Sequence, residues 1–337
     1  MANKQINIII TGSAGYIGAP LAYELLNLGY KIIGIDNYSN SISKNTEILK
    51  QNFIQNYNFY NVDIALEPSK LNAIFLKYKP KIVIHLAALK SVRESISNPD
   101  LYKNNNINSL VNMLNCMSLH NCKKIIYSSS AAVYGNQKIQ PICEDVNLNP
   151  SSPYADTKLF CEKLINNACD QNDINGVSLR YFNPIGYHSS KLFRDVLNNN
   201  EGNIMQQIIK VALGKNKFLN IYGGNYSTDD GTCERDFIHI DDVIDAHIKS
   251  IKYMDSSNGH EIFNIGTGVP ISILELINIF IEKNNIPINY KFTEKKEGDI
   301  KSCYADAKKI NKKMKWKASK NIQDMVEDAW SVYNTES

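Results

Sequence analysis

A glycine-rich turn near the N-terminus constrains the fold of this chain more than any other feature. A mostly apolar run, residues 6–10, leads into the turn, and residues 16–28 follow it with the apolar spacing of a helix. Backbone N–H groups at such a helix N-terminus can face a phosphate group. The residues expected around that phosphate are Gly12, Gly15, Tyr16, Ile17 and Gly18. The turn therefore predicts the first strand–turn–helix unit of a parallel sheet.

Asp36 ends the next apolar run, residues 31–36. At this spacing a carboxylate accepts hydrogen bonds from the hydroxyls of an adenosine ribose and repels a 2′-phosphate. We therefore expect the chain to bind NAD rather than NADP. Asn37 beside it, and Asp63 with Ile64 after the third strand, are expected to border the adenosine.

Strands and helices alternate in the first half of the chain, which predicts an α/β fold with a doubly wound parallel sheet of the Rossmann type. Strand patterns cover residues 6–11, 31–36, 81–86, 123–128 and 177–181, and helical patterns cover 16–28, 99–120 and 153–168. After Pro184 the pattern loosens into Asn-rich loops and short strands such as 218–222, which predicts a smaller second α/β lobe.

The two lobes are expected to interleave, because three later segments have the pattern of a returning strand–helix–strand unit. These segments are residues 235–240, 243–251 and 261–265. The expected division assigns residues 1–184, with the returning part at about 235–266, to a dinucleotide-binding domain. Residues 185–234 and 267–337 then form the substrate lobe.

Composition excludes several classes of protein. The net charge is +3, from 37 basic and 34 acidic side chains mixed along 337 residues, which does not favour nucleic-acid or membrane binding. No apolar run approaches the roughly 20 residues of a membrane span, and the start shows no export signal. The 7 cysteines include no Cys-x-x-Cys pair and argue against a disulfide framework. We expect a cytoplasmic protein without a structural metal.

Tyr154 and Lys158 are spaced i,i+4 on the expected helix 153–168, and Ser130 follows the strand 123–128. A tyrosine is a poor base at neutral pH because its ordinary pKa is about 10. An ammonium on the same helix face favours the ionised phenol, and Ser130 can share the proton. The three side chains therefore indicate hydride chemistry on a nicotinamide cofactor.

Taken together, the motifs resemble those of UDP-hexose 4-epimerases, a branch of the extended short-chain dehydrogenase/reductase superfamily. The matching segments, spread over residues 6 to about 330, are Ser128-Ser129-Ser130-Ala131-Ala132-Val133-Tyr134-Gly135, Pro153-Tyr154-x-x-x-Lys158, Arg180-Tyr181-Phe182-Asn183-Pro184, Gly231-Thr232-x-x-Arg235-Asp236-Phe237-Ile238-His239 and Glu297-Gly298-Asp299. The resemblance implies that Tyr154 removes the proton of the sugar 4′-hydroxyl while C4 passes hydride to NAD. The resulting 4-keto sugar would turn over and take hydride and proton back on its other face, so that tightly bound NAD is regenerated in each turnover.

The resemblance also implies roles for residues outside the catalytic trio. On the cofactor side these residues are Lys90, Asn105, Lys158 and Tyr181. In the UDP-sugar site they are Lys90, Ser130, Tyr154, Asn183, Asn203, Arg235, Lys296, Asp299 and Cys303.

Several positions depart from the family pattern. Lys296 stands where arginine is usual, so that a bidentate grip on the pyrophosphate becomes a point-charge contact. Ala132 lacks a hydroxyl that the family places there, and residues 191–203 lack the usual prolines.

Cys303 stands where epimerases restricted to glucose and galactose typically have tyrosine. A thiol in this place leaves room for a 2-acetamido group. We therefore expect UDP-GlcNAc and UDP-GalNAc to be accepted as well as UDP-Glc and UDP-Gal. The alternative is a buried cysteine without effect on specificity.

Other functions remain open from the sequence. A nucleotide-sugar 4,6-dehydratase would use an Asp-Glu pair after the catalytic hydroxyl, where this chain has Ala131-Ala132. A uronate epimerase or decarboxylase is also allowed by the sequence. A catalytically silent NAD-binding protein is a further alternative, which the intact trio opposes.

Two of the expected helices, 99–120 and 153–168, carry more apolar residues than packing on a sheet requires. These are Leu110, Met113, Leu114 and Met117, and Leu159, Phe160, Leu164 and Ile165. They suggest a homodimer formed helix to helix, and the alternative is that they fill the core of the monomer.

Overall fold

A seven-stranded parallel sheet forms the centre of the computed structural model, which describes residues 6–172, 174–197, 203–295 and 300–333. The strand order is β10-β6-β5-β4-β1-β2-β3. The strands are β1 (Asn7–Thr11), β2 (Lys31–Asp36), β3 (Tyr57–Asn61), β4 (Ile82–His85), β5 (Lys124–Ser130), β6 (Asn175–Tyr181) and β10 (His260–Ile265). The order reverses between β1 and β4, so the carboxyl ends of these two strands mark the point where ligands bind in such sheets.

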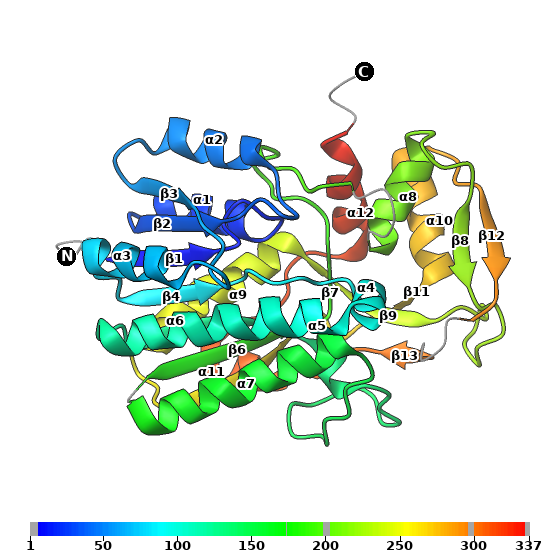
Figure 1. Cartoon of the computed structure of the whole chain (residues 1–337). Coiled ribbons are helices and arrows are strands. Elements are labelled where there is room, and N and C mark those ends of the chain that lie inside the picture. Colours follow the sequence, from blue (N-terminus) through cyan, green and yellow to red (C-terminus); the bar gives the residue numbers. More distant parts are fainter. Residues whose placement is uncertain (1–5, 173, 198–202, 296–299, 334–337) are drawn as a thin grey trace.

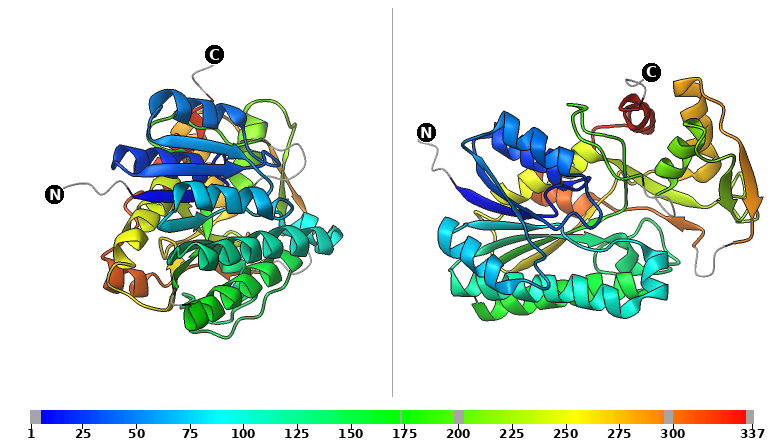
Figure 2. Two further views of the ribbon diagram at one scale, coloured as in Figure 1. Left: turned by 60° about the vertical axis from the view of Figure 1, so that its left-hand side comes forward. Right: turned by 45° about the horizontal axis from the view of Figure 1, so that its top comes forward.

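Helices cover both faces of this sheet, as Figures 1 and 2 show. One face carries α1 (Gly18–Asn27), α2 (Ser43–Asn52), α9 (Ile240–Tyr253) and α11 (Lys308–Met314), and the other carries α3 (Pro68–Tyr78), α6 (Asn108–Leu119) and α7 (Pro153–Asn172). In β1, Ile8 and Ile10 pack into the first layer while Ile9 packs into the second. Burial on both faces explains why the centre of the strand, Ile8 to Ile10, is continuously apolar. The predicted doubly wound α/β fold is confirmed.

A second lobe lies beyond the carboxyl edge of the sheet (Figure 1). It contains a four-stranded sheet of β7 (Asn183–Ile185), β9 (Glu234–His239), β11 (Pro270–Ser272) and β13 (Ser302–Cys303), and a two-stranded sheet of β8 (Leu219–Tyr222) and β12 (Tyr290–Thr293). Its helices are α8 (Ile204–Ala212), α10 (Ile273–Asn284) and α12 (Ile322–Ser331). These elements enclose a separate hydrophobic core that includes Ile208, Phe237 and Phe280.

The expectation that residues 235–240 return to the large sheet is wrong. This segment, β9, pairs with β7, β11 and β13 in the second lobe, and only β10 returns beside β6. The reason lies in β7, which begins one residue after β6 and lies outside the large sheet. β9 pairs with β7 there.

The expected helix 99–120 is interrupted. The chain forms α5 (Pro99–Tyr102), a π-helical segment (Lys103–Ile107) and then α6, and a short α4 (Val92–Ser97) precedes them. Within the π-helical segment the Asn106 side chain is bonded to Leu89 and to Thr157. Such single π turns are frequent at functional sites.

The apolar surplus on α6 and α7 is accounted for largely by the core of the monomer. Leu110, Met113, Met117 and Ile165 are fully buried, whereas Phe160 is 48% exposed. Leu114 and Leu164 are partly buried against the same core, and Leu159 packs on a smaller cluster beside it.

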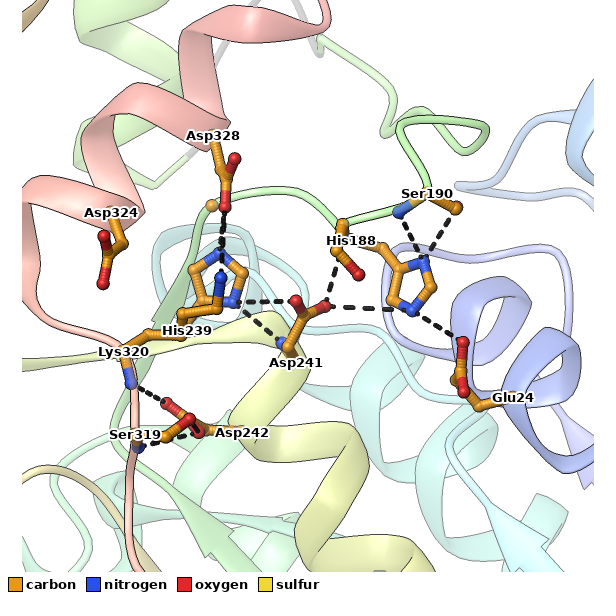
Figure 3. Close-up of polar contacts among 12 residues, drawn as sticks. Glu24, His188, Ser190, His239, Asp241, Asp242, Ser319, Lys320, Asp324 and Asp328 are labelled. Carbon is orange, nitrogen blue, oxygen red and sulfur yellow. Dashed lines mark hydrogen bonds and ion pairs between the residues drawn. The ribbon is translucent and has the colours of Figure 1, made fainter. Parts of the chain in front are cut away.

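A chain of imidazoles and carboxylates joins the two lobes; we call it the junction cluster (Figure 3). His188 Nε2 lies 3.3 Å from Glu24 Oε1 of α1 and 3.8 Å from Asp241 Oδ1 of α9. His239 Nδ1 accepts a hydrogen bond from the Asp241 backbone N–H, and its Nε2 lies 3.2 Å from Asp328 Oδ2 of α12. The cluster therefore connects α12 of the second lobe with α9 and α1 on the sheet.

No helix in the described part of the chain combines the length and the apolar character needed to cross a bilayer.

Candidate active site

The glycine turn between β1 and α1 has no space for a Cβ atom at Gly12 or Gly18, and we call the backbone surface that results the glycine cradle. Gly12 has a φ of +68°, and a Cβ there would lie 3.0 Å from the Ala87 backbone nitrogen. A Cβ on Gly18 would lie 2.0 Å from the Gly12 carbonyl oxygen. The Gly15 N–H donates to the same oxygen, which closes the turn. The open N-terminus of α1 thus suits a pyrophosphate that approaches the backbone closely.

Asp36 holds the glycine turn from the end of β2. Its Oδ2 accepts from the Ala14 N–H at 3.0 Å, and its Oδ1 accepts from the Tyr38 N–H and the Ser41 hydroxyl at 2.8 Å each. An ionised carboxylate has about four acceptor positions, so capacity remains for a ribose hydroxyl.

The other residues expected around the adenosine lie in two different environments. Asn37 donates from Nδ2 to Asp63 Oδ2 at 2.9 Å, which brings these two predicted residues together beside Asp36. Ile64, in contrast, is buried in the core under α3.

The three side chains predicted to be catalytic, Ser130, Tyr154 and Lys158, meet where β5 ends and α7 begins. Ser130 is the last residue of β5, and Tyr154 and Lys158 lie in the first turns of α7. Lys158 is 2% exposed; its Nζ donates to the Ser128 carbonyl at 2.7 Å and lies 5.8 Å from the centre of the Tyr154 ring. A phenol, a hydroxyl and an ammonium are therefore gathered at the carboxyl edge of the sheet.

Burial controls the electrostatics of this trio. It raises the pKa of the Tyr154 phenol, and the interaction with the Ser130 hydroxyl lowers it. Burial also lowers the pKa of Lys158 to about 8, against the opposing influence of Cys161 and Glu162. Of the two partners expected to tune Tyr154, Ser130 does so here, while the Lys158 ammonium is engaged with Ser128.

A buried ion pair beneath the trio was missed by the sequence reasoning. Glu162 accepts from Arg180 Nε at 2.9 Å and from Arg180 Nη2 at 2.6 Å, and it also accepts from the Ser129 hydroxyl at 2.5 Å. The spacing of Glu162, four residues after Lys158, is the signal that could have found it.

Asn106 was also missed, since the sequence pointed to its neighbour Asn105. Asn106 is 2% exposed and ties Leu89 to Thr157 of α7, while Asn105 donates to the Asn106 side chain. The bonds of Asn106 to Leu89 and Thr157 fix the loop after β4 against α7. Lys90, in that loop, is more than half exposed and lies 4.0 Å from Asp195.

Tyr181 lies at the end of β6, but its hydroxyl is engaged in the core. His247 Nδ1 lies 2.8 Å from the Val243 carbonyl and must donate to it, so its Nε2 accepts the Tyr181 hydroxyl at 2.7 Å. The hydroxyl thus bonds to α9 within the core.

The second lobe supplies the residues expected in the UDP-sugar site besides Lys90, Ser130 and Tyr154. Arg235 on β9 and Cys303 on β13 are direct neighbours across the sheet. Asn183 donates to the Asp236 carbonyl, and Asn203 is the N-cap of α8, where it accepts from the Gln206 N–H. Lys296 and Asp299 lie outside the described residues.

Comparison with known proteins places this arrangement in a family. The family model described as GDP-mannose 4,6 dehydratase matches residues 9–329. The UDP-glucose 4-epimerase of Bacillus subtilis is 36% identical over 96% of this chain and 95% of its own length. A solved UDP-glucose 4-epimerase from Stenotrophomonas maltophila, with bound NAD and formylated UDP-arabinopyranose, superposes with a TM-score of 0.94 at 32% identity, over 98% of each chain. The solved UDP-Glc/GlcNAc 4-epimerase of Campylobacter jejuni gives a TM-score of 0.86 at 28% identity, over 98% of this chain and 99% of that one. The chain belongs to the UDP-glucose 4-epimerase family of the extended short-chain dehydrogenase/reductases.

Proposed function

We propose that this protein is an NAD-dependent 4-epimerase that interconverts UDP-Glc and UDP-Gal. The observation that carries the proposal is the meeting of Tyr154, Lys158 and Ser130 at the sheet edge that also holds the glycine cradle. Ala131 and Ala132, directly after Ser130, begin a short 3-10 turn and offer neither the acid nor the base that a dehydratase needs. Membership of the epimerase family supports the same choice.

The chain's own residues fit NAD at two points. The cradle at Gly12 and Gly18 accommodates a pyrophosphate, and Asp36 can accept from a ribose hydroxyl. When bound, NAD supplies the chemistry of accepting a hydride from the sugar C4 and returning it.

Tyr154 acts as the general base and then as the general acid. Its phenolate takes the proton of the 4′-hydroxyl as hydride leaves C4, which yields a 4-keto sugar. Ser130 shares this proton, and the Lys158 ammonium favours the phenolate. After the ketone has turned over, hydride adds to its other face and Tyr154 returns the proton, so that the configuration at C4 is inverted.

Cys303 leads us to propose a wider range of substrates, which includes UDP-GlcNAc and UDP-GalNAc. The thiol is 8% exposed and packs with Phe182 and Ala131, next to the catalytic turn. Arg235 is its neighbour on β9. A small side chain at this place leaves the room that a 2-acetamido group requires.

The substrate range is tested with purified protein and no added NAD. UDP-Glc and UDP-GlcNAc are incubated separately, and the C4 epimers are resolved by anion-exchange chromatography. We expect both to be converted by the wild type and by Cys303→Ala, whereas Cys303→Tyr should lose the N-acetyl pair and keep UDP-Glc. Equal effects of Cys303→Tyr on both pairs would contradict the role of the thiol.

We also propose a homodimer, formed through α4, α5 and α7, which contact one another. Large apolar side chains are exposed on these helices: Val92, Ile96, Leu101 and Phe160 are each between 46% and 62% accessible. Light scattering during gel filtration should give twice the chain mass for the wild type and the mass of a monomer for Phe160→Glu. A monomeric wild type would contradict this proposal.

A further inference from the structure

Three side chains of different chemistry form a stripe along α7. Tyr154, Lys158 and Glu162 follow one another at four-residue spacing, so they lie on successive turns of one helix face. The proposed function uses the first two. Glu162, one turn deeper, has no part in that mechanism.

Glu162 fastens α7 to two strands at once. Ser129 of β5 and Arg180 of β6 are direct partners in the sheet, and both donate to the Glu162 carboxylate. The guanidinium forms a fork with two bonds, and its Cζ also lies 4.7 Å from the centre of the Tyr134 ring. The strands that end at Ser130 and Tyr181 are thereby fixed against the helix that carries Tyr154.

The ion pair between Arg180 and Glu162 is not explained well by a contribution to the stability of the fold alone. The Arg180 and Glu162 side chains are 1% and 3% exposed. Transfer of two charges into such a place costs several kcal/mol per ion, and apolar side chains of equal volume are often as stable or more so. A role beside the catalytic lysine accounts for the charges better.

Glu162 differs from the other titratable side chains that influence Lys158, because it is negatively charged. Burial lowers the pKa of His85 to about 3, and burial raises the pKa of Tyr127 and of Cys161, so these three side chains are uncharged at neutral pH. Burial also raises the pKa of Tyr154, so the phenolate that the proposed function requires forms only with the help of Ser130 and Lys158. Among the described groups that influence Lys158, Glu162 thus supplies the negative charge that opposes loss of the ammonium proton.

We propose that Glu162 is a positioning residue for hydride transfer: it locks α7 to β5 and β6, and its charge keeps Lys158 in the ammonium form beside Tyr154. This inference rests on the proposed epimerase function, because it is there that the ammonium is needed.

The test follows the protonation of Lys158 directly, in the purified holoenzyme labelled with ¹³Cε-lysine. The Lys158 resonance is assigned by its loss in Lys158→Arg and is titrated by NMR. We expect it to titrate near pH 8 in the wild type and about one pH unit or more lower in Glu162→Gln. The matched control is Asp156→Asn, which removes an exposed carboxylate from the same helix and should leave the titration unchanged. Equal midpoints in Glu162→Gln and Asp156→Asn would overturn the proposal.

Turnover provides the second readout. At pH 8, kcat for UDP-Glc should fall about fivefold or more in Glu162→Gln with little change in KM, because a shift of one pH unit lowers the share of molecules that hold the ammonium from about half to about a tenth. If Glu162→Gln does not fold, Glu162→Gln combined with Arg180→Met removes both charges, and a shift in the same direction is expected. An unshifted Lys158 resonance in that double variant would also overturn the proposal. Failure of the proposed function is seen separately, as a wild type that does not convert UDP-Glc.

Discussion

Two polar clusters each join several elements of this molecule, and they differ in their charged groups and in their exposure to solvent. Beneath the catalytic trio, Arg180 and Glu162 form a forked ion pair that is closed to solvent. At the junction cluster, histidines alternate with carboxylates that are between 19% and 35% exposed. An arginine keeps its charge at every accessible pH, whereas a histidine changes its charge near neutrality. The arginine beneath the trio is thus charged at every accessible pH, whereas the charge of the junction cluster depends on whether its imidazoles are protonated.

The largest effect is expected from Tyr154→Phe, which acts on the chemistry and not on the scaffold. Loss of the general base should reduce kcat by about a thousandfold, within the usual 10²–10⁴ range for acid–base catalysis. The melting temperature should stay close to that of the wild type, because the ring and its packing are kept. Turnover within tenfold of the wild type would show that another group removes the proton.

A smaller effect, on stability, is expected at the junction cluster from Asp328→Asn. The contact with His239 holds the pKa of Asp328 below its ordinary value, so the carboxylate stabilises the fold at neutral pH. Urea unfolding at pH 7 should show a loss of about 1 kcal/mol, the upper value for an ion pair with a partly exposed partner. Glu327→Gln, an exposed neighbour on the same helix, is the matched control and should change little.

The pH dependence of Asp328→Asn has a definite sign. Because the folded-state pKa of Asp328 is lowered, its contribution is fully present above the unfolded value of about 3.9 and is lost as the pH falls through the folded value. The difference between wild type and variant should therefore shrink in strongly acidic buffer. A constant difference would mean that the carboxylate acts through packing alone.

The smallest effect is expected from His188→Asn. Burial lowers the pKa of His188, against the opposing pull of Asp241 and Glu24. A depressed histidine pKa means that the unfolded chain binds the proton first, so stability is lost as the pH falls below about 6.5. Between pH 7.5 and 5.5 the wild type should therefore lose slightly more stability than the variant, by less than about 1 kcal/mol. A larger acid loss in the variant would contradict the neutral state of His188.

The sequence predicted the large sheet well, because its strands carry a strong physical signal. A strand buried on both faces, such as β1, has a continuously apolar centre, here Ile8 to Ile10, and a glycine turn between such a strand and a helix is typical of a dinucleotide-binding fold. Short strands of the second lobe carry no such signal. The segment 235–240 has only Phe237, Ile238 and Ile240 as apolar residues, and its partner strand β7 is three residues long and has no pattern in the sequence.

In the candidate site, too, the residues that form local sequence patterns were predicted and those that depend on distant contacts were missed. Tyr154, Lys158 and the glycine turn are local patterns, readable within a few residues. The link between Glu162, Ser129 and Arg180 joins three elements, so it requires the register of β5 and β6. Asn106 was missed for a related reason, since its role depends on a π-helical turn that directs its side chain at Leu89 and Thr157.

The central claim is that hydride leaves C4 of a UDP-hexose and returns to the same carbon. The most direct test incubates purified protein with UDP-Glc in D₂O, without added NAD, and follows the products by proton NMR. We predict that UDP-Gal forms with its C4 hydrogen fully retained, because a hydride held on the cofactor does not exchange with solvent. Deuterium at C4, or no UDP-Gal even after NAD is supplied, would contradict the account.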